Sequence, residues 1–82
     1  MLYIIILAYY LEMTTFYKKL GRKIFQLRKA KKLSREVFAE KADINDYYLG
    51  EIERGEKKAS LDTLFKICKV FDIKIYELLN IE

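Results

Sequence analysis

The sequence has no His, Pro or Trp and only one Cys, and these absences exclude several kinds of site. A single Cys cannot form a disulfide within the chain, and there is no Cys/His cluster for zinc, so we expect no metal and no cofactor. Without His there is no nucleophile–base pair of the usual kinds, and no Gly-rich phosphate loop is present. An enzyme is therefore not expected, and a chain without disulfides fits a reducing, cytoplasmic setting.

Length and charge indicate one small domain with a polyanionic partner. The 82 residues suffice for one domain, which is marginal in size and can gain from dimerisation. Net charge is +4, and the segment from Lys18 to Arg35 has nine Lys or Arg and no Asp or Glu. This segment is where a polyanion would be attracted, although a solvated helix face is the alternative interpretation.

Residues 1–13 differ in composition from the rest and are treated as an apolar N-terminal extension of a domain at 14–82. Their apolar run spans Met1 to Leu11, about half of the roughly 20 residues that cross a bilayer. It has no basic flank or small-residue cleavage site, as a signal peptide would. Its β-branched and aromatic residues favour a strand. An upstream extension of the reading frame, a short interaction segment and a membrane anchor all stay open.

Helical periodicity and capping residues predict five helices after residue 13. Thr14 or Thr15 can cap a first helix that ends near Lys31 and Lys32. The next three helices can be capped by Ser34, Asn45 and Ser60, and the turn between the second and third helices has Asp43 where an αL conformation is needed. Gly55 is a C-cap signal, and a short fifth helix carries Ile75, Leu78 and Leu79. Cys68 lies on the inward face of the fourth helix and is expected to be a small buried hydrophobe.

Three pieces of the chain, in order and with matching spacing, carry a family resemblance: LGRKIFQLRKAKKLS, FAEKADI and YYLGEIERGEKKASLDTLFKICKVFDIKIYELL. From about Leu20 to Leu79 the chain resembles the lambda-repressor-like helix-turn-helix family of the Cro/CI or XRE type. The resemblance implies an all-α fold of five helices, with the second helix against the DNA backbone and the third in the major groove. The chain departs from the family pattern by having Asp43 for the Gly of the turn, Arg35 for Gln and Ala59 for Pro.

The resemblance also assigns candidate site residues. Those expected to face base edges are Asp46, Tyr47 and Glu51. Those expected to contact phosphates are Ser34, Arg35, Asn45, Arg54, Lys57 and Lys58. Arg28 and Glu53 are expected to form a partly buried ion pair between the first and third helices. Two carboxylates on a DNA-reading face are unusual, because they are unfavourable near phosphates unless they accept a specific hydrogen bond, for example from cytosine N4.

The expected function is a sequence-specific, DNA-binding transcriptional regulator, a dimeric repressor that reads double-stranded DNA with the segment from Asn45 to Arg54. A homodimer would bind two half-sites about one helical turn apart. Its dimer surface could be the C-terminal end, Ile75 to Ile81, or the N-terminal apolar run. The alternative is a protein-interaction module on the same fold, antitoxin-like or partner-binding, which the acidic reading face favours. No small-molecule ligand is evident.

Overall fold

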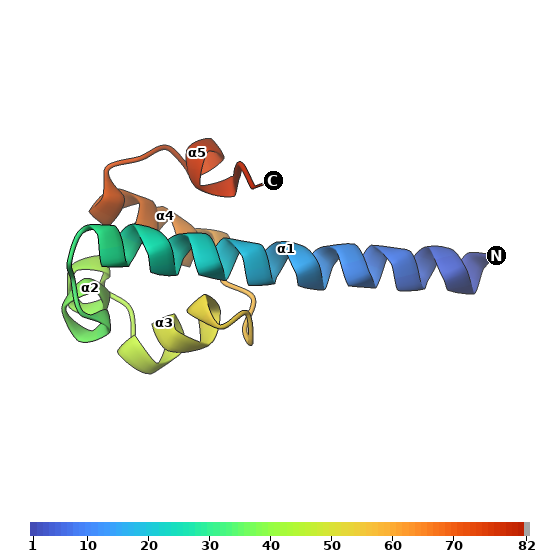
Figure 1. Cartoon of the computed structure of the whole chain (residues 1–82), viewed down its shortest axis with the longest axis horizontal. Coiled ribbons are helices and arrows are strands. Elements are labelled where there is room, and N and C mark those ends of the chain that lie inside the picture. The colour runs from blue at the N-terminus through green and yellow to red at the C-terminus, as the bar shows by residue number, and fades with distance from the viewer. Residues whose placement is uncertain (82) are drawn as a thin grey trace.

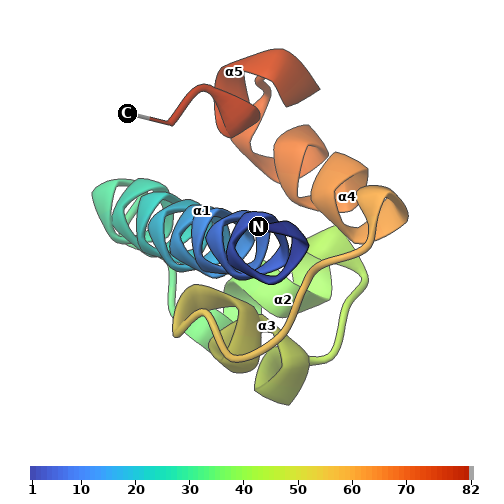
Figure 2. The ribbon, with the colours of Figure 1, turned by 90° about the vertical axis from the view of Figure 1, so that its right-hand side faces the viewer.

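The computed structural model describes residues 1–81, which form five helices and no strand. These are α1 (Leu2–Ala30), α2 (Arg35–Ala42), α3 (Asp46–Glu53), α4 (Leu61–Phe71) and α5 (Ile75–Leu79). α2 to α5 surround the C-terminal half of α1, and α3 and α5 lie on opposite sides of it (Figures 1 and 2). The all-α, five-helix architecture predicted from the sequence is confirmed.

The start of α1 is the largest departure from the sequence-based expectation. The apolar residues that favoured a strand are helical from Leu2, and the helix continues unbroken through Thr14 and Thr15. Thr14 Oγ1 donates to the carbonyl oxygen of Leu11 (3.0 Å), so this hydroxyl bonds within the helix and caps no N-terminus. A single strand would leave its backbone groups without partners, whereas a helix satisfies its own. The predicted start of the first helix at residue 14 is therefore wrong.

The predicted caps of the next three helices are confirmed. Ser34 Oγ accepts from the backbone N–H of Val37 at 3.2 Å, and Ser60 Oγ does the same for Thr63 at 3.1 Å. Asn45 Oδ1 accepts from the N–H groups of both Tyr47 (2.8 Å) and Tyr48 (3.1 Å). Asp43 has φ 57° and ψ 48°, the left-handed conformation expected for the turn. These local bonds fix where the chain reverses between α2 and α3.

The core lies where α1, α2, α3 and α4 meet. Phe38 of α2 is fully buried, and its ring centroid is 4.8 Å from that of Phe71 in α4. The other fully buried large side chains are Leu20, Ile24, Leu49, Ile67 and Leu78. Cys68 is 3% exposed, as expected of a small hydrophobe, and burial raises the pKa of its thiol. A raised pKa keeps the thiol protonated and unreactive.

Lys23 connects α1 to the end of α5. Its ammonium donates to the carbonyl oxygens of Glu77 and Asn80, so α1 satisfies carbonyl groups at the end of α5. This contact keeps α5 on the side of α1 that faces away from α3 (Figure 2). No helix within residues 1–81 combines the length and the apolar character needed to cross a membrane.

Candidate nucleic-acid interface

One face of α3 points into solvent and the other is part of the core. Leu49 and Ile52 are buried, while Tyr47 is 67% exposed, Glu51 is half-buried and Arg54 is exposed. This division follows from the 3.6-residue period of the helix, which places positions 47, 51 and 54 on a common side. The outer face of α3 is thus available to a partner that fits a single helix.

Asp46 lies to one side of this face. It lines a shallow hollow between α2 and α3 together with Glu36, Glu40 and Asn45. Three carboxylates therefore share the hollow, and Asp46 is half-buried. Of the three residues predicted to face bases, Tyr47 and Glu51 lie on the outer face of α3, and Asp46 lies at its edge toward α2.

Two arginines meet over Gly50. A Cβ added to Gly50 would lie 3.0 Å from Arg35 Nη1 and 3.1 Å from Arg54 Nη1, so the guanidinium groups from α2 and from the end of α3 converge on this glycine. Arg35 Nε is buried and has no hydrogen-bond partner, and the nearest acidic group to Arg35 is Glu36, at 4.0 Å. Gly50 allows the close approach of the two side chains, which brings two guanidinium groups together beside the outer face of α3.

Arg54 is already paired. Its Nε lies 2.9 Å from Glu56 Oε2, and the two groups form two hydrogen bonds. This bond raises the pKa of the Arg54 guanidinium and lowers the pKa of the Glu56 carboxyl. Glu56 was not among the sequence-predicted site residues. A phosphate that contacts Arg54 must share it with Glu56, so Arg35 is the less neutralised of the two arginines.

The loop after α3 brings in two predicted residues and one that sequence reasoning missed. Lys57 and Lys58 are exposed, and Gly55 has φ 75°. A Cβ on Gly55 would lie 2.7 Å from Lys18 Cγ, so the loop is seated on α1 at Lys18. Lys18 therefore adds a basic side chain beside the loop. Its only signal in the sequence is membership of the basic run from Lys18 to Arg35.

Ser34, at the start of α2, borders a second hollow, which is lined by basic side chains. Lys29 and Lys32 line it with Ser34, whose side chain caps the start of α2. Lys29 and Lys32 were not singled out from the sequence. Not all of the basic run is free to attract a polyanion, because Lys23 is bonded to the end of α5 and Arg28 is buried.

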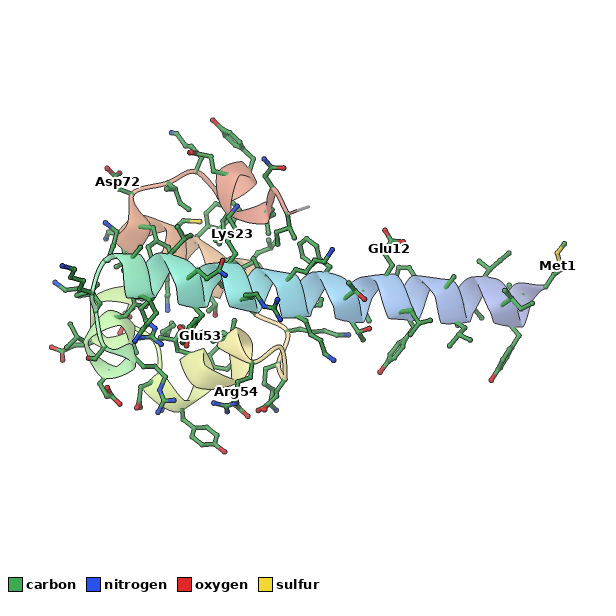
Figure 3. All side chains as sticks on the ribbon, viewed as in Figure 1. Met1, Glu12, Lys23, Glu53, Arg54 and Asp72 are labelled. Atoms are coloured by element: carbon green, nitrogen blue, oxygen red, sulfur yellow. The ribbon has the colours of Figure 1, made fainter. Side chains whose placement is uncertain are left out.

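Arg28 and Glu53 form a bidentate pair between α1 and α3. Arg28 Nε to Glu53 Oε2 is 2.7 Å and Arg28 Nη2 to Glu53 Oε1 is 3.0 Å, with side chains only 8% and 6% exposed. Arg28 Nη1 also donates to the carbonyl oxygen of Leu33 (2.9 Å), just before α2. One guanidinium thus connects α1, the start of α2 and α3 (Figure 3 labels Glu53 and Arg54 at the end of α3). The pair fixes how far α3 stands from α1.

Comparisons with known proteins agree with this geometry. The helix-turn-helix family HTH_3 matches residues 24–78. The control protein C.BamHI of Bacillus amyloliquefaciens is 36% identical over 61 residues, which is 73% of this chain and 75% of that protein.

Two solved structures superpose closely. The restriction-modification controller C.AhdI of Aeromonas hydrophila has a TM-score of 0.73 at 35% identity, covering 76% of this chain and 94% of the other. SinR, described as the master regulator for biofilm formation and solved in complex with DNA, has a TM-score of 0.71 at 37% identity, covering 74% and 98%. With a family match over more than half of its length, this chain belongs to the helix-turn-helix family of XRE-type, lambda-repressor-like regulators.

Proposed function

We propose that this protein is a sequence-specific DNA-binding transcriptional regulator that acts as a dimeric repressor. The observation that carries the proposal is the meeting of Arg35 and Arg54 over Gly50, beside the exposed face of α3. A basic group from the start of α2 and one from the end of α3 then belong to a single surface. A phosphate held there would set the position of α3 against the bases.

Some residues of this surface would position the protein on the phosphate backbone, and others would read the bases. Arg35, Lys57 and Lys58 would neutralise phosphates, and the N–H groups at the starts of α2 and α3 would donate to phosphate oxygens. Tyr47 and Glu51 would meet base edges, Tyr47 with its ring or hydroxyl and Glu51 by accepting from cytosine N4. Asp46, at the edge of α3 toward α2, would meet a base edge at the border of the site. Arg54 would contact phosphate while shared with Glu56.

The relatives support a regulatory role. One is named a control protein, one a restriction-modification controller, and one was solved bound to DNA. The family is regulatory, and we propose no catalytic activity for this chain. The experiment that tests the function is selection of bound sites from a random duplex pool. An enriched inverted repeat with half-sites one turn apart is expected, and a pool without enrichment would contradict sequence-specific binding.

Charge removal at Arg35 is expected to weaken binding without changing its selectivity. Arg35→Ala should lower affinity for selected and random duplexes by the same factor. The salt slope, meaning the slope of log affinity against log salt concentration, should shrink by about 1 for each lost phosphate contact. Glu51→Ala should instead weaken the preference for cytosine at one position, because it removes the carboxylate that would accept from cytosine N4. Fluorescence anisotropy with both duplexes at several salt concentrations measures both effects.

Arg22→Ala is the matched control for the arginine substitution. Arg22 is exposed and lines a hollow with Asn80, on the α5 side of α1, so the same loss of charge there should leave the slope nearly unchanged. If Arg22→Ala weakens binding as much as Arg35→Ala, net charge and not the α2–α3 surface carries the affinity, and the assignment of Arg35 is wrong.

A second candidate function is a protein-interaction module. The hollow that Asp46 shares with Glu36 and Glu40 favours it, because three carboxylates suit a basic partner protein better than a phosphate backbone. Absence of duplex binding at low salt would favour this candidate, and tight binding with a steep salt slope would exclude it as the main function.

A further inference from the structure

The N-terminal third of α1 extends beyond the rest of the fold and is covered by nothing. We call residues Leu2–Leu11 the arm; its side chains project into solvent between Met1 and Glu12 (Figure 3). Every large apolar side chain in it is at least 48% exposed. These nine are Leu2, Tyr3, Ile4, Ile5, Ile6, Leu7, Tyr9, Tyr10 and Leu11. The longest dimension of the molecule, 47 Å against 24 and 21 Å, lies along this helix.

Summed over all of its sides, the arm exposes more apolar area than a monomer usually shows in one patch. A large side chain presents on the order of 150–250 Å², so nine such side chains at these exposures offer on the order of 1,000 Å². Monomeric proteins rarely show an apolar patch above roughly 300–600 Å², whereas a stable interface buries roughly 800 Å² of each partner. The total therefore exceeds the apolar patch of a typical monomer, and a partner packed along one side of the arm would cover part of it.

The arm carries a heptad-spaced apolar stripe that continues the buried face of α1. Leu20 and Ile24 face the core, and counting back in steps of four and three gives the half-buried Phe16 and Met13 and then Tyr9, Ile6 and Leu2 within the arm. We call these five residues the arm stripe. The opposite side of the helix has Ile4, Ala8, Leu11 and Thr15. A stripe of this spacing is what two helices need to pack side by side along their length.

We propose that the arm pairs with the arm of a second copy of this chain, antiparallel and through the arm stripe. The stretch from Leu2 to Tyr17 is apolar except at Glu12, Thr14 and Thr15, and Lys18 and Lys19 follow it. Full antiparallel overlap of this stretch, which includes the arm, is centred between Tyr9 and Tyr10. The pairing brings the arm stripe of one copy, exposed from Leu2 to Tyr9, against that of the other, and it places the two folded units at opposite ends of the pair.

The spacing that this pairing produces matches DNA. A Cβ on Gly21 would overlap the carbonyl oxygen of Ile52, so Gly21 marks the level of α3 along α1. At a rise of about 1.5 Å per residue, Gly21 lies about 17 Å from the centre of the pair, which separates the two α3 helices by about 34 Å along the helix axis. Half-sites one turn apart are about 34–36 Å from centre to centre. A parallel pair would bring both α3 helices to the same level. This spacing argument rests on the proposed function, whereas the pairing itself does not.

The test compares two substitutions of the same residue type on opposite sides of the arm. Ile6→Glu lies in the arm stripe and Ile4→Glu lies opposite; both side chains are exposed in the single chain (58% and 67%), so neither change disturbs the core. In sedimentation velocity on the full chain at micromolar concentrations, the unsubstituted protein and Ile4→Glu should be dimers. Ile6→Glu should raise the dimer dissociation constant at least about tenfold, since it would bury an unpaired charge. Circular dichroism should show all three equally folded.

Several results would overturn the proposal. The first is that the unsubstituted chain is monomeric, and the second is that Ile4→Glu and Ile6→Glu dissociate the dimer equally. The third is that the unsubstituted chain floats with neutral phosphatidylcholine vesicles, which would make a lipid surface the partner of the arm. The DNA measurement is separate. A dimer that Ile6→Glu dissociates and that binds no duplex supports the pairing and contradicts the proposed function. A monomer that binds DNA supports the DNA-binding part of that function and contradicts the pairing.

Discussion

Arg28→Ala is expected to lower the free energy of unfolding by about 3–5 kcal/mol, because it leaves the Glu53 carboxylate buried without its partner. The two side chains are 8% and 6% exposed and share two hydrogen bonds. The substitution also removes the donor to the Leu33 carbonyl oxygen. A small domain has a total stability of only about 5–15 kcal/mol, so the variant should be close to unfolding at room temperature. Urea denaturation followed by circular dichroism measures the loss.

A double substitution separates the cost of the unpaired charge from the contribution of the pair. Arg28→Met with Glu53→Leu removes both charges from the same buried place, and it should recover most of the lost stability, as apolar replacements of buried pairs often do. Arg22→Ala, which removes an exposed charge from the same helix, should change stability by less than about 0.5 kcal/mol. A loss below about 1 kcal/mol for Arg28→Ala would mean that the pair behaves as an exposed one.

Gly21→Ala is expected to destabilise the protein by about 2–3 kcal/mol, although alanine is the better helix former by about 1 kcal/mol. The added Cβ would overlap the Ile52 carbonyl oxygen and lie 2.7 Å from that of Glu53, and these are backbone atoms that cannot rotate away. α1 and α3 would have to separate, which also strains the neighbouring ion pair. The midpoint of thermal unfolding should fall accordingly.

Gly50→Ala is the matched control, because its Cβ would meet the flexible ends of two arginine side chains. Its stability should stay the same or rise, while its DNA affinity should fall as Arg35 and Arg54 are displaced. If Gly21→Ala were as stable as the unsubstituted protein or more so, the close contact of α1 with α3 at this residue would be refuted.

Much of the fold could be predicted because its signals are local. The side chains of Ser34, Asn45 and Ser60 cap helices by bonding to N–H groups two or three residues ahead, so each start is encoded within a few positions. The beginning of α1 was missed because β propensity describes how a residue fits a sheet that already exists. Residues 2–13 have no strand beside them in the described part of the chain, and the helix of the folded domain extends into them.

The candidate site could be predicted only in part. The exposure of Tyr47 and the half-burial of Glu51 follow from helical period, which depends on a single element. The meeting of Arg35 with Arg54, the pairing of Arg54 with Glu56, and the contact of Lys18 with Gly55 depend on how side chains or separate segments come together. Periodicity carries no information about such contacts. Gly50 acquires its role only when the side chains of Arg35 and Arg54 are placed around it.

The central claim is that the α2–α3 surface binds duplex DNA through its phosphates and reads bases with α3. Its most direct test is a fluorescence titration of a labelled duplex carrying the selected site, with a random duplex beside it, at 50 and 200 mM salt. A dimer making six or more phosphate contacts should lose about 10³-fold or more in affinity over this range and should prefer the selected site throughout. Equal, salt-insensitive affinity for both duplexes, or no binding at 50 mM, would contradict the account.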